Sequence, residues 1–284
     1  MLSKDFKAIV SLIMITTVFS SCEDENLNTV AANQFVVEAF LFAGEPVDDI
    51  RIKSTFPLTE EEDTSIPIND ADVQLFKDGQ SYRLIASGSD GYYHYPGDDL
   101  VINTNDVLDL EVSSDGITAT ATTQVPSPTV GLELSQDSIK VPTIPFLQGR
   151  DAIVEAIGNF LRNSSIQATW DNPESDLYFM VVESVREEID PIFPQQVIDA
   201  LEQFRFVSEP TDETELTFLA GSLVSFGQYS VRVYHINDEY ADLYDNRAQD
   251  SRDLNEPPSN IQNALGVFSA FNSQTAYFEV VRAE

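Results

Sequence analysis

The sequence predicts a mostly β protein built from two β-sandwich domains, the second with inserted helices. Three observations predict this class. Hydrophobic residues recur with a period of two over about 90 residues from Phe35, turn signals interrupt them every 8–12 residues, and helical periodicity appears only later in the chain. With 284 residues, 42% of them hydrophobic and 10% aromatic, the chain is long enough to bury sizeable cores.

Residues 1–21 predict a lipoprotein signal peptide. Lys4 and Lys7 form a positive start, and an apolar run follows over residues 8–19. This run is shorter than the roughly 20 residues that an ordinary membrane span needs. The segment is therefore a secretory signal and takes no part in the fold.

Cys22 is the only cysteine, so an intrachain disulfide and a cysteine-rich zinc site are excluded. Ser20-Ser21-Cys22 resembles the lipobox of bacterial lipoproteins. That resemblance implies cleavage before Cys22 and acylation of its thiol with fatty acids such as palmitate, and several acyl chains anchor a protein stably. The alternative is an incidental cysteine beside a general secretion site.

Three acidic residues, Glu23, Asp24 and Glu25, follow the cysteine directly. They resemble the signal that sends lipoproteins of the Bacteroidetes across the outer membrane to the cell surface. The alternative is a solvated acidic tether, which we expect over residues 22–34 in either case.

The first sandwich is expected over residues 35–128, with an immunoglobulin-like pattern of short strands. Asp78-Gly79 and Asp115-Gly116 are hairpin-turn signals, and the prolines of residues 125–129 mark a boundary. Strands are expected over residues 34–42, 49–53, 71–76, 81–86, 91–96 and, as a pair, 107–125.

The second sandwich is expected over residues 129–284 and is fibronectin type III-like. Apolar residues at helical spacing predict helices over residues 151–163, 194–204 and 237–248. Trp170 ends a strand and is interpreted as a core anchor in preference to a sugar-stacking platform. Strands are expected over residues 165–170, 176–185, 214–226, 229–236, 265–271 and 275–281.

The charge balance limits the partners. The chain carries 15 Lys and Arg against 48 Asp and Glu, a formal net charge of −33, which repels nucleic acid and anionic membrane surfaces. Cationic ligands, Ca²⁺ and basic proteins remain compatible. The acidic loop 60–63 could meet a basic partner or serve only as a solvated loop.

No residue is assigned a catalytic role. His94 and His235, the only histidines, each lie in an alternating strand pattern, and no Gly-x-Ser-x-Gly motif occurs. No cofactor and no metal ligand are assigned either. A structural Ca²⁺ is kept as one reading of the oxygen-rich residues Asn103–Asp106, Asp245, Asn246, Asp250 and Asp253, although neither stretch follows an EF-hand.

Several stretches resemble, in the same order, a Bacteroidetes family of secreted lipoproteins known only as a domain of unknown function. The stretches are FVVEAFLF, NDADVQLFKDGQSYRL, Trp170-Asp171 before DLYFMVVE, and PPSNIQNALGVFSAF. Ala39 and Ala264 stand where the family often has glycine. The resemblance implies a transthyretin-like or carboxypeptidase-regulatory-like first sandwich, an envelope location and a neighbouring TonB-dependent transporter, and it brings no catalytic residues.

Together these observations favour a non-enzymatic outer-membrane protein, anchored through Cys22 and facing the cell surface. It would capture ligand for, or scaffold, a TonB-dependent β-barrel transporter. An adhesion or matrix-interaction protein on the same fold is the first alternative, and a hydrolase is the second.

Overall fold

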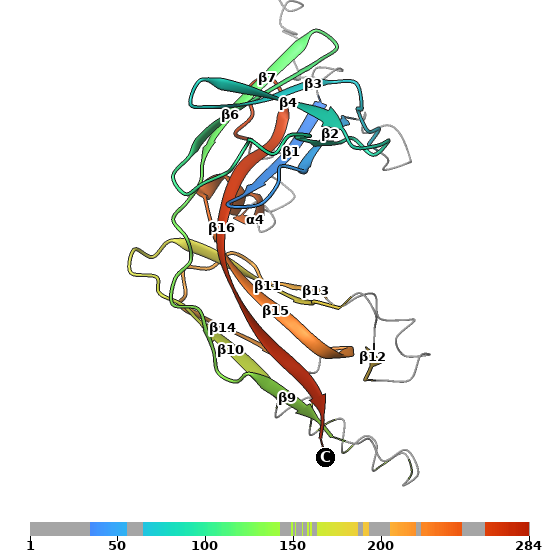
Figure 1. Ribbon diagram of the computed structural model, residues 1–284, viewed down its shortest axis with the longest axis vertical. Helices are drawn as coiled ribbons and strands as arrows, with labels where there is room; N and C mark the ends of the chain where they lie inside the picture. Colours follow the sequence, from blue (N-terminus) through green and yellow to red (C-terminus); the bar gives the residue numbers. More distant parts are fainter. Residues whose placement is uncertain are drawn as a thin grey trace, which may run out of the picture.

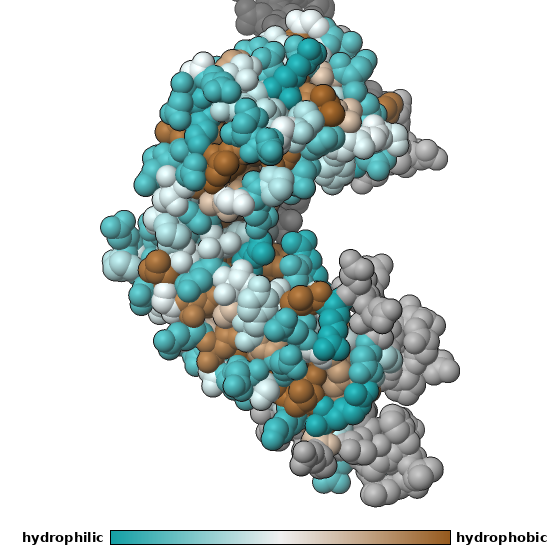
Figure 2. Space-filling view, in the orientation of Figure 1, coloured by the Kyte–Doolittle hydropathy of each residue, from teal (hydrophilic) through white to brown (hydrophobic). Residues whose placement is uncertain are grey.

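The computed structural model describes residues 35–55, 65–142, 164–186, 190–192, 205–219, 223–245 and 259–283, with single positions between 149 and 160. The chain forms a crescent with one sandwich at each end (Figure 1). In the same orientation, hydrophilic residues cover much of the surface of both sandwiches, with hydrophobic residues between them (Figure 2). The predicted fold class is confirmed: the described chain is mostly strand, in sandwich-type sheets.

The first sandwich contains every strand that the alternating pattern predicts. Its two tight hairpins are confirmed as well: Asp78 and Gly79 have φ of 52° and 78°, and Asp115 and Gly116 have φ of 50° and 80°. Two successive positive φ values give the turn that matches strand twist. The strands are β1 (Phe35–Phe42), β2 (Asp49–Ser54), β3 (Asp72–Lys77), β4 (Gln80–Ala86), β5 (Tyr92–His94), β6 (Val107–Ser114) and β7 (Ile117–Gln124).

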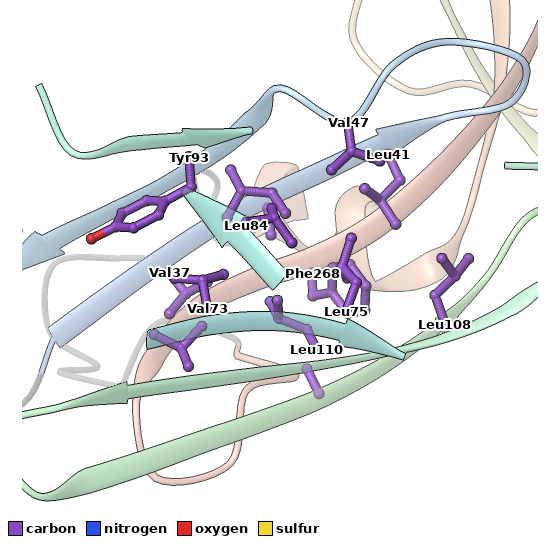
Figure 3. Packing of buried hydrophobic residues seen from close by; sticks show 14 of the residues in the cluster. Val37, Leu41, Val47, Val73, Leu75, Leu84, Tyr93, Leu108, Leu110 and Phe268 are labelled. Atoms are coloured by element: carbon purple, nitrogen blue, oxygen red, sulfur yellow. The ribbon is translucent and has the colours of Figure 1, made fainter. Parts of the chain in front are cut away.

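These strands form one strongly curved sheet in the order β1-β2-β5-β4-β3-β6-β7. Alternate side chains point inward, as the burial of every second residue of β1 shows. Val37, Leu75 and Leu108 meet in this core together with Phe268 from the far end of the chain (Figure 3). The curvature therefore lets a single sheet enclose its own core.

The second sandwich packs a three-stranded sheet, β14-β10-β8, against β13-β11-β15-β16. Trp170 is 4% exposed and its ring lies 5.8 Å from that of Tyr178, which confirms it as a core anchor. The strands are β8 (Glu133–Leu134), β9 (Ser138–Val141), β10 (Ser165–Thr169), β11 (Leu177–Ser184), β12 (Asp190–Pro191), β13 (Arg205–Val207), β14 (Glu215–Leu219), β15 (Ser225–Ile236) and β16 (Leu265–Arg282).

The three predicted helices have different outcomes in the structure. The third is confirmed as α4 (Asp238–Asp245), with Asp238 and Glu239 in its first turn. The described positions of the first predicted helix, which include the buried Phe160, are helical. The second, over residues 194–204, lies outside the described residues.

The last strand differs from the prediction of two strands over 265–271 and 275–281. A single strand, β16, runs from Leu265 to Arg282 along most of the crescent (Figure 1). Its first part pairs in parallel with β1, and the part from Asn272 onward pairs antiparallel with β15. Phe268 and Ala270 of β16 pack in the first core, although they lie in the range predicted for the second sandwich. The boundary between residues 128 and 129 stays a prediction.

The segment just before β16 fastens it to the first sandwich. The Asn260 side chain bonds both backbone groups of Phe268, donating to its carbonyl at 2.7 Å and accepting from its amide at 2.9 Å. Gln262 exchanges two backbone hydrogen bonds with Thr120 of β7. This segment belongs to the stretch PPSNIQNALGVFSAF, one of those on which the family resemblance rests, and it joins β16 to the opposite edge of the first sheet.

Several contacts tie the two sandwiches together. Arg232 of β15 pairs with Glu45 of the β1–β2 loop at 2.6 Å. Phe42 of β1 stacks on Phe271 with ring centroids 5.1 Å apart and meets Tyr234 of β15 at 5.7 Å. Aromatic pairs of this kind add about 0.5–1.5 kcal/mol beyond their buried area. The junction is therefore a packed interface and not a linker.

Gly266→Ala should unfold or severely weaken the protein. Gly266 has φ of +118°, and a Cβ there would lie 1.9 Å from the carbonyl oxygen of Val37 in β1. We expect a loss of at least about 3 kcal/mol in the free energy of unfolding, measured by urea denaturation. Gly44→Ala is the matched control: its φ is +75° but nothing lies within 4 Å of the new Cβ, so it should lose only about 1 kcal/mol. Equal losses would contradict the close-approach explanation.

Asp49→Asn should stabilise the protein at pH 7 but not at pH 3. Burial raises the pKa of Asp49, and the charges of Asp48 and Glu38 raise it further against the opposing effect of Arg205. Ionised Asp49 is therefore disfavoured in the fold, so stability is lost as pH rises through its raised pKa. Thermal unfolding at the two pH values tests this, with the exposed Asp98→Asn as control for removing one charge. A gain that is the same at both pH values would refute it.

Candidate functional site

The sequence-predicted site residues Cys22, Glu23, Asp24 and Glu25 lie outside the described residues, as does the acidic loop 60–63. Their roles stay predictions. Among the residues that the structure describes, no helix has the length and apolar character needed to cross a membrane.

Both histidines lie in strands, as their sequence pattern predicts. His94 in β5 is half-buried, and its Nδ1 lies 2.8 Å from the hydroxyl of Ser87. His235 at the end of β15 is 7% exposed, and its ring stacks on Tyr178 with centroids 4.8 Å apart.

His235 lies between a serine and an aspartate that are distant in sequence. Its Nδ1 is 2.9 Å from the backbone carbonyl of Ser127 and 3.1 Å from the Ser127 hydroxyl, and its Nε2 is 3.4 Å from Asp176. A carbonyl only accepts, so Nδ1 carries a proton and donates it. It cannot then take the hydroxyl proton, as the base of a Ser-His-Asp triad must. The three residues instead tie the inter-sandwich connection to β11 and β15.

A pocket of about 600 Å³ opens at this point, between the two sandwiches. The first sandwich contributes the start of β6 and the end of β7, and the second contributes the starts of β11 and α4 and the end of β15. Its described lining comprises Val107, Thr122, Thr123, Gln124, Ser175, Asp176, Leu177, His235, Ile236, Asn237, Asp238 and Glu239.

Local sequence explains how α4 enters the pocket. The Asn237 carbonyl accepts the first hydrogen bonds of the helix, and acidic residues follow in the first turn, where the helix dipole favours them. The Asn237 amide donates to the carbonyl of Gln124 at 2.8 Å, and Glu239 accepts from Thr123 at 2.7 Å. The helix start is therefore docked on β7.

The electrostatics of this pocket are negative. Asp176, Asp238 and Glu239 line it, and the described lining contains no Lys or Arg. Burial raises the pKa of Tyr178 beneath His235, and the charges of Asp176 and Glu174 raise it further. Carboxylates in a concavity with protein walls concentrate a negative potential there.

A second pocket of about 340 Å³ lies beside the first, on the outer face of β3, β6 and β7. The two share Thr122. The described lining is again acidic, with Asp109 and Glu111, and again has no Lys or Arg. The whole described lining is Phe76, Asp109, Leu110, Glu111, Thr120, Ala121, Thr122, Asn260 and Gln262.

The calcium reading finds no support at Asn103–Asp106. The Asp106 carboxylate pairs with Lys77 at 2.5 Å and accepts a hydrogen bond from the backbone N–H of Asn103 at 2.6 Å, so its negative charge is already compensated. Asp245 ends α4, and Asn246, Asp250 and Asp253 lie outside the described residues. In the described part of the chain, no group of three or more His, Cys, Asp or Glu could hold a metal.

The fold and this pocket define a class: a mostly β protein of two joined sandwiches with a polar pocket at the junction. Within that class, the chain belongs to the family described as a domain of unknown function, DUF4249, whose model matches residues 20–276. The match includes Cys22. No curated protein sequence matches the chain.

Solved structures that are similar to this chain consist of fibronectin and immunoglobulin-type modules. Titin domains A168–A170 align at 14% identity and TM-score 0.20, over 72% of this chain and 60% of theirs. Two fibronectin type III domains of chicken tenascin align at 9% and 0.25, over 87% and 99%. The FN1–FN3 domains of chicken CNTN1 align at 12% and 0.26, over 87% and 66%. The chain thus spans less than two thirds of the titin and CNTN1 fragments, and its fold is established by its own strand pairing.

Proposed function

We propose that this protein is a non-enzymatic lipoprotein of the outer membrane, anchored through Cys22 and facing the cell surface. There it serves a TonB-dependent β-barrel transporter as an accessory that captures ligand or acts as a scaffold.

The observation that carries the proposal is the lone cysteine at the end of the apolar run, preceded by two serines and followed by three acids. The family match extends over this cysteine, so it lies within the family's domain. Residues 22–34 could place the body of the protein at most about 45 Å from the membrane surface. The two sandwiches, which are joined by direct contacts, would present the pocket at their junction to a partner or ligand within that distance of the membrane.

Affinity purification of the tagged, acylated full chain from its own membranes tests the accessory role. In mild detergent we expect a large β-barrel transporter to co-purify in near-equal amount, identified by mass spectrometry. Cys22→Ser is the matched control for anchoring: it should incorporate no labelled palmitate and should leave the membrane fraction. Recovery of the acylated chain without any barrel would refute the accessory role, and a cell-attachment defect on deletion with normal nutrient uptake would favour adhesion.

Replacing Glu23, Asp24 and Glu25 together with Ala should hide the protein from protease added to intact cells. The reason is that acids behind the acylated cysteine are proposed to direct export across the outer membrane. We expect near-complete cleavage of the wild type and at least about tenfold slower cleavage of the variant, since an intact outer membrane excludes the protease. Immunoblots would measure this, with lysed cells as the control for cleavability. Equal cleavage of both chains on intact cells would rule out the sorting role.

A further inference from the structure

The strand β7 is the last strand of a sheet that runs continuously in the order β13-β11-β15-β16-β1-β2-β5-β4-β3-β6-β7. Most backbone groups on its outer side have partners. The Thr118 carbonyl accepts from the Asn263 amide at 3.1 Å, and Thr120 exchanges two bonds with Gln262. The Gln124 carbonyl accepts from Asn237. Thr122, two residues from Thr120, faces the same way, because backbone groups alternate along an antiparallel strand.

Among the described residues, neither the N–H nor the C=O of Thr122 has a partner on this outer side. Its side chain is engaged, since the hydroxyl donates to Asp109 at 2.5 Å. An unpaired donor and acceptor at a sheet edge is where an extended chain can add hydrogen bonds.

The two pockets flank this opening. Both include Thr122, the larger lying toward Asn237 and the smaller toward Gln262. Each combines carboxylates with an apolar residue: Val107 in the larger pocket, 52% exposed, and Phe76 in the smaller. Lys and Arg side chains need this combination, because their stems pack on apolar surface while their charged ends meet acids.

We infer that the edge of β7 at Thr122, which has no backbone partner among the described residues, forms with its two flanking pockets a docking surface for an extended basic segment of a partner protein. The segment pairs its backbone with Thr122 and places one Lys or Arg side chain in each pocket. Charge complementarity selects this occupant, because the described linings hold five carboxylates, Asp109, Glu111, Asp176, Asp238 and Glu239, and no Lys or Arg. A small cation could occupy one pocket, but it would not pair with the backbone of Thr122 between the two pockets.

This inference rests on the proposed binding role and names its surface, but it does not depend on the lipid anchor. The probe is a fluorescent nine-residue peptide of alternating Arg and Thr, titrated by anisotropy against the purified full chain at about 0.15 M salt. A matched peptide with Gln in place of Arg serves as the neutral reference. We expect the basic peptide to bind and the neutral one to bind at least tenfold more weakly.

The double variant Asp238→Asn/Glu111→Gln removes one carboxylate from each pocket, and neither side chain makes a hydrogen bond within the described structure. We expect it to lose about tenfold in affinity for the basic peptide. The control variant Asp98→Asn/Glu213→Gln makes the same change of charge at exposed sites away from the pockets and should bind as the wild type does. Thermal unfolding of both variants establishes that they are folded.

Three results would overturn the inference: no binding of the basic peptide, an equal loss in the control variant, or free L-arginine binding as tightly as the peptide. Repeating the membrane purification with the double variant separates the two proposals. If the double variant still co-purifies with the transporter and binds the peptide as the wild type does, the docking surface is refuted and the accessory role stands. If peptide binding depends on the pockets but no β-barrel co-purifies with the wild type, the docking surface is supported and the accessory role is refuted.

Discussion

The pairing of one continuous strand, β16, with both sandwiches is the constraint on which the rest of the structure depends. Its first part lies beside β1 and its later part beside β15, so the two cores share a single stretch of backbone. Residues 267–272 are buried without alternation, because one face of the strand enters the first core while Phe271 faces the aromatic junction. The hydrogen bonds that hold each sheet together therefore also join the two sandwiches to each other.

The crossing explains why the sequence favours two strands where the protein has one. Residues 272–275, Asn-Ser-Gln-Thr, look like a polar turn between apolar runs. In the fold, Asn272 donates to Thr104 and to the carbonyl of Pro126, and Gln274 accepts from the amide of Leu132. Thr275 accepts from Arg232. These polar side chains form hydrogen bonds with the segments that connect the sandwiches. Those partners are distant in sequence, so local periodicity cannot reveal them. Local patterns predict the strands of the first sandwich because their side chains alternate between core and surface, and they predict the hairpins at Asp78 and Asp115 because the turn residues are adjacent in the sequence.

The pocket at the junction could not be predicted from the sequence either, because it also depends on contacts between distant segments. Its residues come from segments near positions 107, 123, 176 and 237, and only the long-range pairing brings them together. The helix-start signal at Asn237 was visible in the sequence, but its amide bonds Gln124 on the other sandwich. Likewise, His235 fits its strand pattern, while the contacts with Ser127 and Asp176 appear only in the fold. The sequence pattern predicts which strand each of these residues occupies, but it does not predict that the residues come together in one pocket.

The acidic excess is distributed in a way that total charge does not show. Most Lys and Arg side chains in the described part of the chain are already paired with a carboxylate: Lys53 with Glu38, Lys77 with Asp106, Arg83 with Asp72, Arg205 with Glu183, Arg232 with Glu45, and Arg282 with Asp190. Isolated surface pairs of this kind contribute little stability, but they use up the scarce positive charge. The described linings of the two pockets beside β7 contain no Lys or Arg, and only Asp176 has a basic side chain next to it there, that of His235 at 3.4 Å. These carboxylates lie in concave surfaces, where their fields reinforce one another. Among the described residues, these carboxylates gather beside Thr122, where the edge of β7 has no backbone partner, and this arrangement is complementary in charge to the basic segment proposed to dock there.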